Sequence, residues 1–378
     1  MIEKIKSPFL RAFIFLLIPV SLFAYQIKGI WITRWELNSP DNIKLLTDSL
    51  HKAGITDAYV QVFGSGEAYY ESSTAPVKHS SFDPLGEFIK HSDKRYRIHA
   101  WINLLYMWDR REMTRDRNHI LRKHPEAVLR DNAMRSIMDY THDDLRNRNI
   151  EGIYVSPASE DVRKFITSVI NEIMTQYDID GIHLDYCRYP GKEFVYDKYL
   201  RSRFQSVYLV DPALMDSIDR RIYGNNISAV NWAWGQFPAQ TLTGLIGDIN
   251  AAVNEYSDDM ILSASVISDI IRAGNALHQS WWEWIENDYI DYAVIMAYSP
   301  YLSVLKKQIE NIRSRIGLEK IVVGLGSYNQ SLKNVKYNYE MISIYNPLGA
   351  AIFSSKSLMD KEGGFSYVGN YIFSKDAQ

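Results

Sequence analysis

Short apolar runs rich in β-branched and aromatic residues recur along the chain, and amphipathic segments with a helical period separate most of them. Eight such runs predict strands, at residues 29–35, 58–64, 97–103, 181–186, 261–267, 291–298, 320–326 and 350–355. The helical patterns cover residues 41–53, 161–177, 242–256, 302–316 and 333–345. Eight strand and helix units in succession predict a TIM (β/α)8 barrel.

The spacing of the runs predicts where the barrel carries extra chain. Most runs start 29 to 39 residues after the previous one, close to the ~30 residues of a βαβ unit, but the fourth and fifth start 84 and 80 residues later. We expect long loops at residues 104–157 and 190–240, on the rim where such barrels build their active sites. A doubly wound open sheet shares the alternating pattern and is the rival fold, although no Gly-rich phosphate loop follows the first strand.

The first 24 residues have the pattern of a secretory signal peptide. Lys4, Lys6 and Arg11 precede an apolar run at residues 12–24, which is shorter than the ~20 residues that a transmembrane helix needs. We therefore expect residues 1–24 to be a signal peptide and residues 25–378 to form one barrel domain, with export to the periplasm or the outside of a bacterial cell and no integral membrane segment after cleavage. An uncleaved anchor is the alternative, because Leu22 is large for its place before the cleavage site.

Composition excludes several classes of partner and cofactor. The net charge is −3, the sequence pI is about 6.3 and no basic run occurs, so we expect no nucleic-acid partner. The single cysteine, Cys187, excludes an internal disulfide and a multi-cysteine zinc site. No H-x-H or H-E-x-x-H spacing occurs, so we expect no metal and no cofactor. Aromatic residues are abundant, with 26 Tyr, 9 Trp and 14 Phe.

The alternation of side chains along the predicted strands indicates which residues point into the barrel. In the fourth strand Ile182 and Leu184 face outward, which turns His183, Asp185 and Cys187 inward. The same parity and the strand ends bring a mixed set to the rim: Trp35, Glu36, Gln61, Trp101, Asn103, Asp185, Tyr186, Arg188 and Tyr298, with Trp232 from the second long loop. Aromatic faces, amides and carboxylates together are typical of a sugar site, so we expect a polysaccharide or oligosaccharide partner.

Three segments resemble the glycosyl-hydrolase-like 10 family, a group of exported bacterial TIM-barrel proteins. They are YDIDGIHLDYCRYP from Tyr177, KGIWITRWEL from Lys28 and NHILRKHPEAVLRD from Asn118. The resemblance implies a glycosidase, and some members of the family cut peptidoglycan strands. By position it carries over Asp180, His183, Asp185, Tyr186 and Arg188 in the fourth strand, and Arg34 and Glu36 after the first.

The chain departs from that family where relatives often carry an aromatic and arginine cluster. Here Trp232 and Trp234 are followed by GQFP, with Pro238 near the expected arginine. A weaker similarity links the fourth strand to chitinase-type barrels, whose D-G-x-D-x-D-x-E frame ends here in Cys187 instead of the glutamate that protonates the leaving oxygen. A thiol is a poor acid for that step, so the acid is either Asp185 or a residue from elsewhere, with Glu36 as the candidate.

These observations favour an exported glycoside hydrolase that acts on polysaccharide, with N-acetylhexosamine-containing strands such as peptidoglycan as the substrate class. Asp185 and Glu36 are the expected catalytic carboxylates, and Arg34, Trp35, Gln61, Trp101, Asn103, His183, Tyr186, Arg188, Trp232 and Tyr298 are the expected substrate-binding residues. The alternative is a glycan-binding barrel without catalytic activity, since a fold alone does not confer activity.

Overall fold

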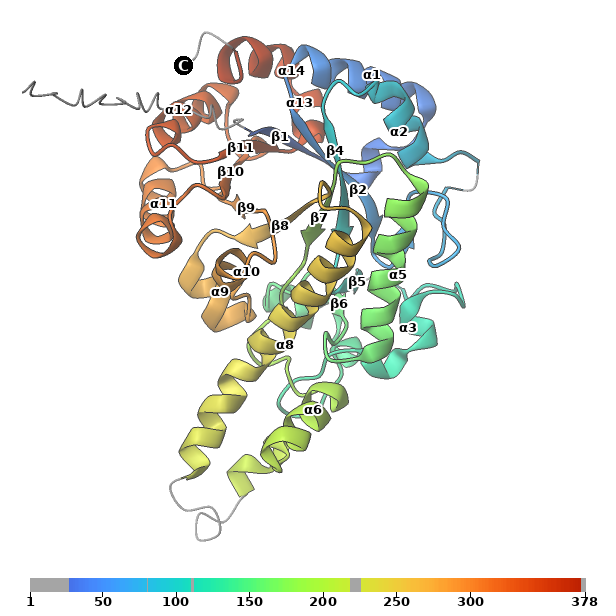
Figure 1. Cartoon of the computed structure of the whole chain (residues 1–378), viewed down its shortest axis with the longest axis vertical. Coiled ribbons are helices and arrows are strands. Elements are labelled where there is room, and N and C mark those ends of the chain that lie inside the picture. Colours follow the sequence, from blue (N-terminus) through green and yellow to red (C-terminus); the bar gives the residue numbers. More distant parts are fainter. Residues whose placement is uncertain (1–26, 80, 110–111, 218–225, 375–378) are drawn as a thin grey trace, which may run out of the picture.

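The computed structural model describes residues 27–79, 81–109, 112–217 and 226–374, and they contain the predicted barrel (Figure 1). Eight parallel strands form a closed sheet, because β1 pairs with both β2 and β11; Ile30, for example, lies opposite Ala58 on one side and Ile352 on the other. The barrel strands are β1 (Ile27–Ile32), β2 (Asp57–Gly64), β4 (Arg97–Asn103), β7 (Gly181–Asp185), β8 (Ile261–Ile267), β9 (Tyr292–Met296), β10 (Ile321–Gly326) and β11 (Gly349–Phe353). Closure confirms the TIM barrel and removes the open-sheet alternative.

Helices cover the outside of the barrel, and several of them have a serine as the N-cap residue. The hydroxyls of Ser39, Ser159 and Ser331 accept a backbone N–H from the first turn of α1, α5 and α12, which satisfies donors that a helix start leaves free. The helices after the strands are α1 (Pro40–Lys52), α2 (Pro84–Ser92), α5 (Glu160–Gln176), α8 (Asn226–Tyr256), α9 (Ile270–Leu277), α10 (Trp281–Glu286), α11 (Leu302–Ile316), α12 (Leu332–Ser343), α13 (Ser355–Met359) and α14 (Gly364–Tyr367).

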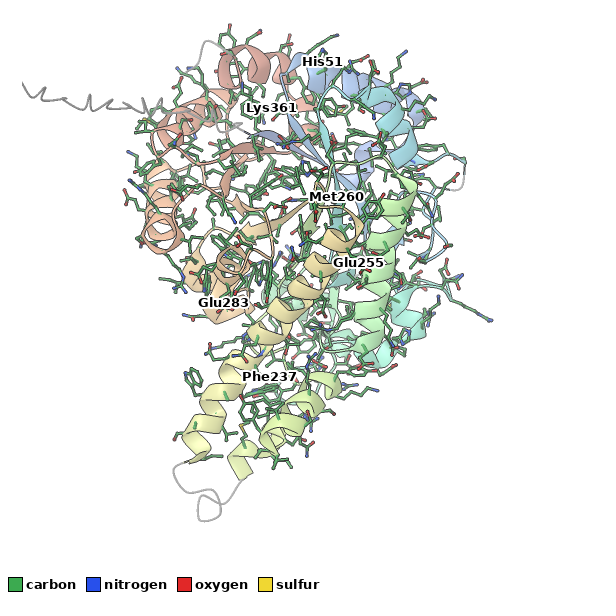
Figure 2. All side chains as sticks on the ribbon, viewed as in Figure 1. His51, Phe237, Glu255, Met260, Glu283 and Lys361 are labelled. Carbon is green, nitrogen blue, oxygen red and sulfur yellow. The ribbon has the colours of Figure 1, made fainter. Side chains whose placement is uncertain are left out.

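Two long insertions follow β4 and β7, as the spacing predicted. The first contains β5 (Tyr106–Trp108), α3 (Ile120–Lys123), α4 (His142–Asn147) and β6 (Ile153–Tyr154), and the second contains α6 (Lys198–Tyr208) and the first half of α8. A short strand, β3 (Glu67–Ala68), extends β2. The helices α6 and α8 project together from the barrel, and Phe237 on α8 packs against Phe204 on α6 with their ring centres 5.1 Å apart (Figures 1 and 2).

The barrel has two apolar layers that follow the alternation of its strands. Ile30, Ile32, Ile182 and Leu184 are fully buried between the strands and the outer helices. The interior holds a separate cluster, half of whose buried members are large aromatic side chains: Ile27, Trp31, Tyr59, Trp101, Tyr292, Val294, Val322 and Ala351. This interior fills the barrel below the rim, so any ligand must bind above it.

Two histidines lie in that interior, and the hydrogen bonds of His183 fix its tautomer. The indole Nε1 of Trp31 donates to His183 Nε2 over 3.1 Å, so Nε2 carries no proton. The proton therefore lies on Nδ1, which donates to Ser263 Oγ at 2.9 Å. Burial lowers the pKa of His183 well below its ordinary value, and the neighbouring His99 adds to this shift. His183 is neutral in the folded protein.

The neutral His183 makes the fold sensitive to acid. In the unfolded chain a histidine titrates near pH 6.5, so below that pH the unfolded state binds a proton that folded His183 does not take up, and stability is lost as the pH falls. We expect the free energy of unfolding, from urea titrations between about pH 6.5 and pH 5, to fall by up to about 1.4 kcal/mol per pH unit because of this residue. His183→Gln should reduce that slope, and an unchanged slope would contradict the interpretation.

Some expectations concern residues that the structure does not describe. The predicted signal peptide at residues 1–24 lies outside the described residues, and its cleavage stays a prediction. In the described part of the chain, no helix has both the length and the apolar character needed to cross a bilayer.

Candidate functional site

A cavity of about 340 Å³ opens at the carboxyl ends of the barrel strands. Nine of the predicted site residues line it: Arg34, Trp35, Gln61, Trp101, Asn103, Asp185, Tyr186, Arg188 and Tyr298. The other lining residues come from β1, β5, β8, β9 and β11 or from just beyond them, and they are Trp31, Thr33, Tyr106, Ser265, Met296 and Phe353. Side chains from seven of the eight barrel strands, or from the residues just beyond them, thus meet in one pocket, as is usual for enzymes with this fold.

Asp185, the last residue of β7, lines this pocket. Its Oδ2 accepts the indole N–H of Trp101 at 3.2 Å, and its Oδ1 accepts the backbone N–H of Tyr186 at 2.6 Å. The side chain is almost completely buried, and this burial raises the pKa of Asp185, although Arg188 and the two N–H donors act in the opposite direction. A carboxyl group whose pKa is raised by burial is suited to giving up a proton near neutral pH.

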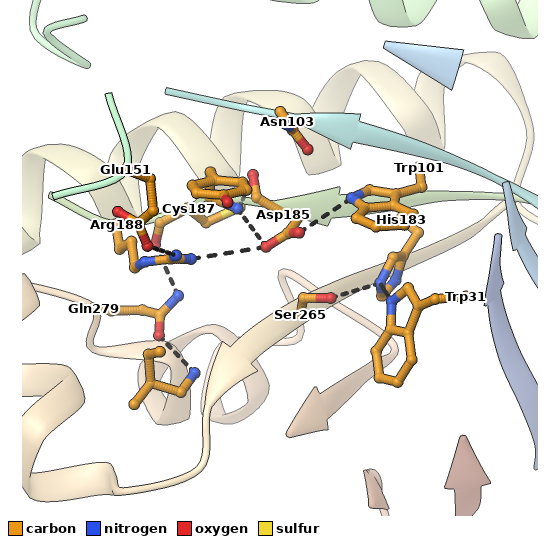
Figure 3. Close-up of polar contacts among 12 residues, drawn as sticks. Trp31, Trp101, Asn103, Glu151, His183, Asp185, Cys187, Arg188, Ser265 and Gln279 are labelled. Atoms are coloured by element: carbon orange, nitrogen blue, oxygen red, sulfur yellow. Dashed lines mark hydrogen bonds and ion pairs between the residues drawn. The ribbon is translucent and has the colours of Figure 1, made fainter. Parts of the chain in front are cut away.

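The guanidinium of Arg188 stands between Asp185 and a second acid, Glu151 (Figure 3). Its Nη2 donates to Glu151 Oε1 at 3.1 Å, while its Nη1 lies 3.8 Å from Asp185 Oδ1. Glu151 comes from the insertion after β4, in an irregular stretch just before β6. The sequence offered no periodic pattern or motif at Glu151, so its place beside the pocket emerges only from the structure.

One wall of the pocket is polar and is held by its own hydrogen bonds. Gln61 Nε2 donates to Asn103 Oδ1 at 3.2 Å, and Gln61 Oε1 accepts the backbone N–H of Arg34 at 3.3 Å. Arg34 Nη2 donates to Ser65 Oγ at 3.2 Å, and its guanidinium packs close to Gly64, where a Cβ would lie only 2.4 Å from Nη1. Glycine at position 64 therefore leaves the room that Arg34 occupies at the rim.

The other walls are aromatic. Tyr298 stacks on Phe353 with ring centres 5.1 Å apart, and Tyr106 stacks on Tyr186 at 4.7 Å. Trp35 stands at the mouth with 57% of its surface exposed, and the Arg34 guanidinium lies 4.6 Å from its ring. Flat apolar faces next to amide and guanidinium donors match the alternation of apolar faces and hydroxyls on a pyranose ring.

The family model described as "Glycosyl hydrolase-like 10" matches residues 26–338. The chain belongs to this family. Among curated relatives it is 29% identical over 187 residues to the glycosyl hydrolase YngK of Bacillus subtilis, and 25% identical over 171 residues to the glycosyl hydrolase DigH of Escherichia coli. These matches cover 44% and 40% of the chain, and only 32% and 37% of the relatives.

Solved structures support the fold of this glycosyl hydrolase-like 10 protein. The glycoside hydrolase domain of PgaB (BpsB) from Bordetella bronchiseptica aligns with a TM-score of 0.71 at 11% identity, over 93% of this chain and 100% of that one. The catalytic domain of a β-amylase from Paenibacillus polymyxa aligns with a TM-score of 0.61 at 13% identity, over 93% and 99%. A chitinase from Cycas revoluta aligns with a TM-score of 0.53 at 9% identity, over 92% and 100%. At these identities the likeness establishes the barrel alone.

Glu36 does not line the described pocket of this glycosyl hydrolase-like 10 barrel, which differs from its expected place at the rim. It is absent from the described lining of the pocket, and its carboxylate accepts hydrogen bonds from Thr33 N at 2.9 Å, Thr33 Oγ1 at 3.1 Å and Ser355 Oγ at 2.6 Å. Burial raises the pKa of Glu36, against the effect of these donors. These hydrogen bonds fix the turn Arg34–Glu36 to the start of α13, and Arg34 and Trp35 of that turn line the pocket.

His183 and Trp232 also lie outside the lining. His183 is one layer lower in the barrel, where its Nε2 lies 2.8 Å from Ser265 Oγ, and Ser265 in turn lines the pocket. Trp232 is 70% exposed, lies in the first turns of α8 and is not among the described residues that line the pocket. Pro238 lies inside the same helix, with Trp234 buried against α6.

Cys187 corrects the expected strand parity. Tyr186 has a φ of 52°, in the left-handed region, which ends the alternation of β7. Cys187 consequently turns outward into the core between strands and helices and lines no part of the pocket among the described residues. Burial raises the pKa of its thiol well above the ordinary value, so Cys187 takes no part in acid chemistry.

One cluster in the described residues has metal-ligand types in reach of one another. It consists of His124, Glu126 and Asp161, all partly exposed, with His124 Nδ1 at 3.4 Å from Asp161 Oδ2. None of the three lines the pocket. The chemistry of the pocket itself has to come from Asp185 and its neighbours.

Proposed function

We propose that this glycosyl hydrolase-like 10 protein is an exported glycoside hydrolase that cuts glycan strands containing N-acetylhexosamine, such as peptidoglycan, with Asp185 as the general acid. The observation that carries the proposal is a buried carboxyl group with a raised pKa in the wall of an aromatic and amide-lined pocket. The glycosyl hydrolase names of its relatives and the glycoside hydrolase barrels among its structural neighbours support the same reaction class. The signal-peptide pattern at residues 1–24 supports export.

The number of acids in the pocket bears on the mechanism. Asp185 is the only carboxylic acid among the described lining residues, whereas most glycosidases place two carboxyl groups about 5 to 10 Å apart across the scissile bond. An N-acetylhexosamine brings its own nucleophile. In the proposed reaction Asp185 protonates the glycosidic oxygen, the bond from the anomeric carbon to that oxygen breaks, and the substrate's acetamido oxygen forms a new bond to the anomeric carbon.

Water completes the reaction with the same residue in the opposite role. The Asp185 carboxylate left by the first step removes a proton from water, whose oxygen attacks the anomeric carbon and releases the acetamido oxygen. Asp185 thereby regains its proton, and the configuration at the anomeric carbon is retained. Gln61 and Asn103 lie in the same pocket and offer amide groups for the hydroxyl and acetamido groups of the sugar.

The shortage of carboxylates also favours a second candidate function, a barrel that binds glycan strands and does not cut them. Both functions use the aromatic walls and the exposed Trp35 at the mouth. They differ in one respect only, whether Asp185 transfers a proton to a bound glycan.

A panel of glycans incubated with the purified protein tests the proposal. We expect shorter fragments from chitooligosaccharides or from peptidoglycan strands freed of peptides, as read by mass spectrometry, and none from cellulose fragments, which lack the acetamido group. Cleavage of the cellulose fragments at a comparable rate would contradict the role of the acetamido group. Binding to a glycan without any product over a long incubation would favour the binding protein.

A further inference from the structure

Glu151 is held on both of its carboxylate oxygens. Oε1 accepts Arg188 Nη2 at 3.1 Å, and Oε2 accepts the hydroxyl of Tyr154 at 2.8 Å. Tyr154 is fully buried at the end of β6, and burial keeps the pKa of its hydroxyl well above the ordinary value, so it stays a donor. The side chain of Glu151 retains 42% of its exposure, yet its position is fixed from two sides.

Arg188 donates a hydrogen bond to Glu151, while another of its nitrogens, Nη1, makes none. The side chain is 9% exposed and lies over the ring of Tyr186, with the guanidinium carbon 4.3 Å from the ring centre. Its Nη1 is buried and makes no hydrogen bond, and it points at Asp185 Oδ1 from 3.8 Å (Figure 3). This separation is longer than a hydrogen bond and short enough for a strong charge effect.

The proposed reaction asks two opposite things of Asp185. The carboxyl group must keep its proton before the glycosidic bond breaks, and it must carry a negative charge afterwards. The positive charge of Arg188 alone would favour the ionised form of Asp185 before the glycosidic bond breaks. The negative charge of Glu151 offsets part of that effect. Nη1 makes no hydrogen bond and already faces the carboxylate that proton transfer creates, which is the arrangement that stabilises a developing charge.

We propose that Glu151 is a positioning residue that acts on Asp185 through Arg188, and that together the two residues decide at what pH Asp185 gives up its proton. This inference rests on the proposed function of Asp185 as the general acid. It assigns a task to the insertion after β4, because that insertion supplies Glu151 and its anchor Tyr154. Burial raises the pKa of Asp185, and the charge of Glu151 acts in the same direction while Arg188 opposes it.

Other groups face Asp185 as well and stay unchanged in the test. Trp101 on β4 and the backbone N–H of Tyr186 donate to its two oxygens. The ionisable groups that interact with Asp185 are Glu151 from the insertion, Tyr186, Cys187 and Arg188 from its own segment, and Tyr298 beyond β9. The tyrosines and the cysteine are neutral at pH values near 7, because burial raises each of their pKa values.

The protonation of Asp185 can be followed without any substrate by infrared difference spectroscopy. The C=O stretch of the protonated group is identified as the band that Asp185→Asn removes, and its loss is titrated against pH. We expect Glu151→Gln to lower the midpoint by about one pH unit, a roughly tenfold weaker hold on the proton, because Arg188 is then unopposed. Arg188→Gln should raise the midpoint. Glu151→Asp keeps the negative charge, so its midpoint should stay close to that of the unchanged protein.

Glu193→Gln is the matched control, because Glu193 also pairs with an arginine from the insertion after β4, Arg148, at 3.1 Å, and neither residue lines the pocket. Its midpoint should equal that of the unchanged protein. The basic limb of the pH profile of kcat/KM should move with the infrared midpoint in each variant. Equal midpoints for Glu151→Gln, Arg188→Gln and the unchanged protein would overturn the inference even in an active enzyme. Shifted midpoints in a protein that cleaves no glycan would instead overturn the proposed function.

Discussion

Asp185→Asn will lower glycan hydrolysis by about 10²- to 10⁴-fold, the usual worth of a general acid, while substrate binding stays close to that of the unchanged protein. Asparagine has nearly the same shape as aspartic acid, and its side-chain oxygen can still accept the indole N–H of Trp101, which now lies 3.2 Å from Asp185 Oδ2. What the variant lacks is a proton for the glycosidic oxygen and an acceptor for the backbone N–H of Tyr186, which Asp185 Oδ1 accepts at 2.6 Å. The measurement is initial rates and KM on the glycan that the panel identifies.

The stability of the same variant separates a catalytic effect from unfolding. Burial raises the pKa of Asp185 above that of the unfolded chain, which means that at neutral pH the folded state holds this carboxyl group at a cost in free energy. An uncharged amide avoids the cost of burying the carboxylate. It also leaves the backbone N–H of Tyr186 without its acceptor, which costs about 1 to 3 kcal/mol. The free energy of unfolding at pH 7, from urea titrations, should therefore fall by no more than about 3 kcal/mol, so that the variant stays folded.

Asp180→Asn is the control for this substitution. Asp180 precedes β7 at the opposite end of the strand, where its Oδ2 accepts the backbone N–H of Ile98 at 2.7 Å, and it lines no part of the described pocket. It should leave the rate of hydrolysis unchanged. Full activity of Asp185→Asn would show that the acid lies elsewhere.

Trp31→Ala will cost about 3 to 5 kcal/mol in the free energy of unfolding, the range for a large aromatic side chain removed from a core. Trp31 is fully buried in the barrel interior, where its ring centre lies 5.5 Å from that of Tyr59 and 5.8 Å from that of Phe353. It packs so closely that a Cβ on Gly324 would lie 2.7 Å from its ring. The substitution also removes the N–H that His183 Nε2 accepts. Chemical denaturation at pH 7 measures the loss.

Trp35→Ala, four residues later, is the matched comparison. Trp35 is 57% exposed at the mouth of the pocket, so removing it should change the free energy of unfolding by no more than about 0.5 kcal/mol. It should instead weaken glycan binding, because a stacking face is lost. If both variants lost similar stability, the division between an inner aromatic core and an outer binding surface would be wrong.

The barrel could be predicted because its information is local and periodic. Each strand is a short apolar run, and runs such as residues 321–326 and 349–353 form strands within a residue or two of their predicted bounds. Strand parity also placed Gln61, Trp101 and Asn103 correctly in the pocket, because these residues lie inside β2 and β4 where alternation holds.

Parity failed where the strands end. The positive φ at Tyr186 reverses the direction of the next side chain, so Cys187 faces the outer core, and no pattern of residue types announces such a dihedral angle at a tyrosine. Glu36 lies in a short turn after β1, where its carboxylate closes onto Thr33 and Ser355, and the second of these contacts joins residues 319 positions apart. Trp232 belongs to a helix that starts well before its predicted segment at residues 242–256, and it does not line the described pocket.

Glu151 could not be predicted at all, and the reason is distance along the chain. It meets Arg188 across 37 positions, from an irregular part of a long insertion, so neither periodicity nor spacing connects the two residues. Contacts of this kind depend on how an insertion folds back over the barrel, which is determined by the packing of many residues together.

The buried cysteine is a built-in probe of local opening in the folded protein. Cys187 is the only thiol in the chain, it lies two residues beyond Asp185 and none of its surface is exposed. A thiol reagent can therefore reach it only in molecules whose segment after β7 has opened. The rate of labelling therefore depends on how often this segment opens. It can be measured without any glycan, and it reports on the segment that carries the proposed acid.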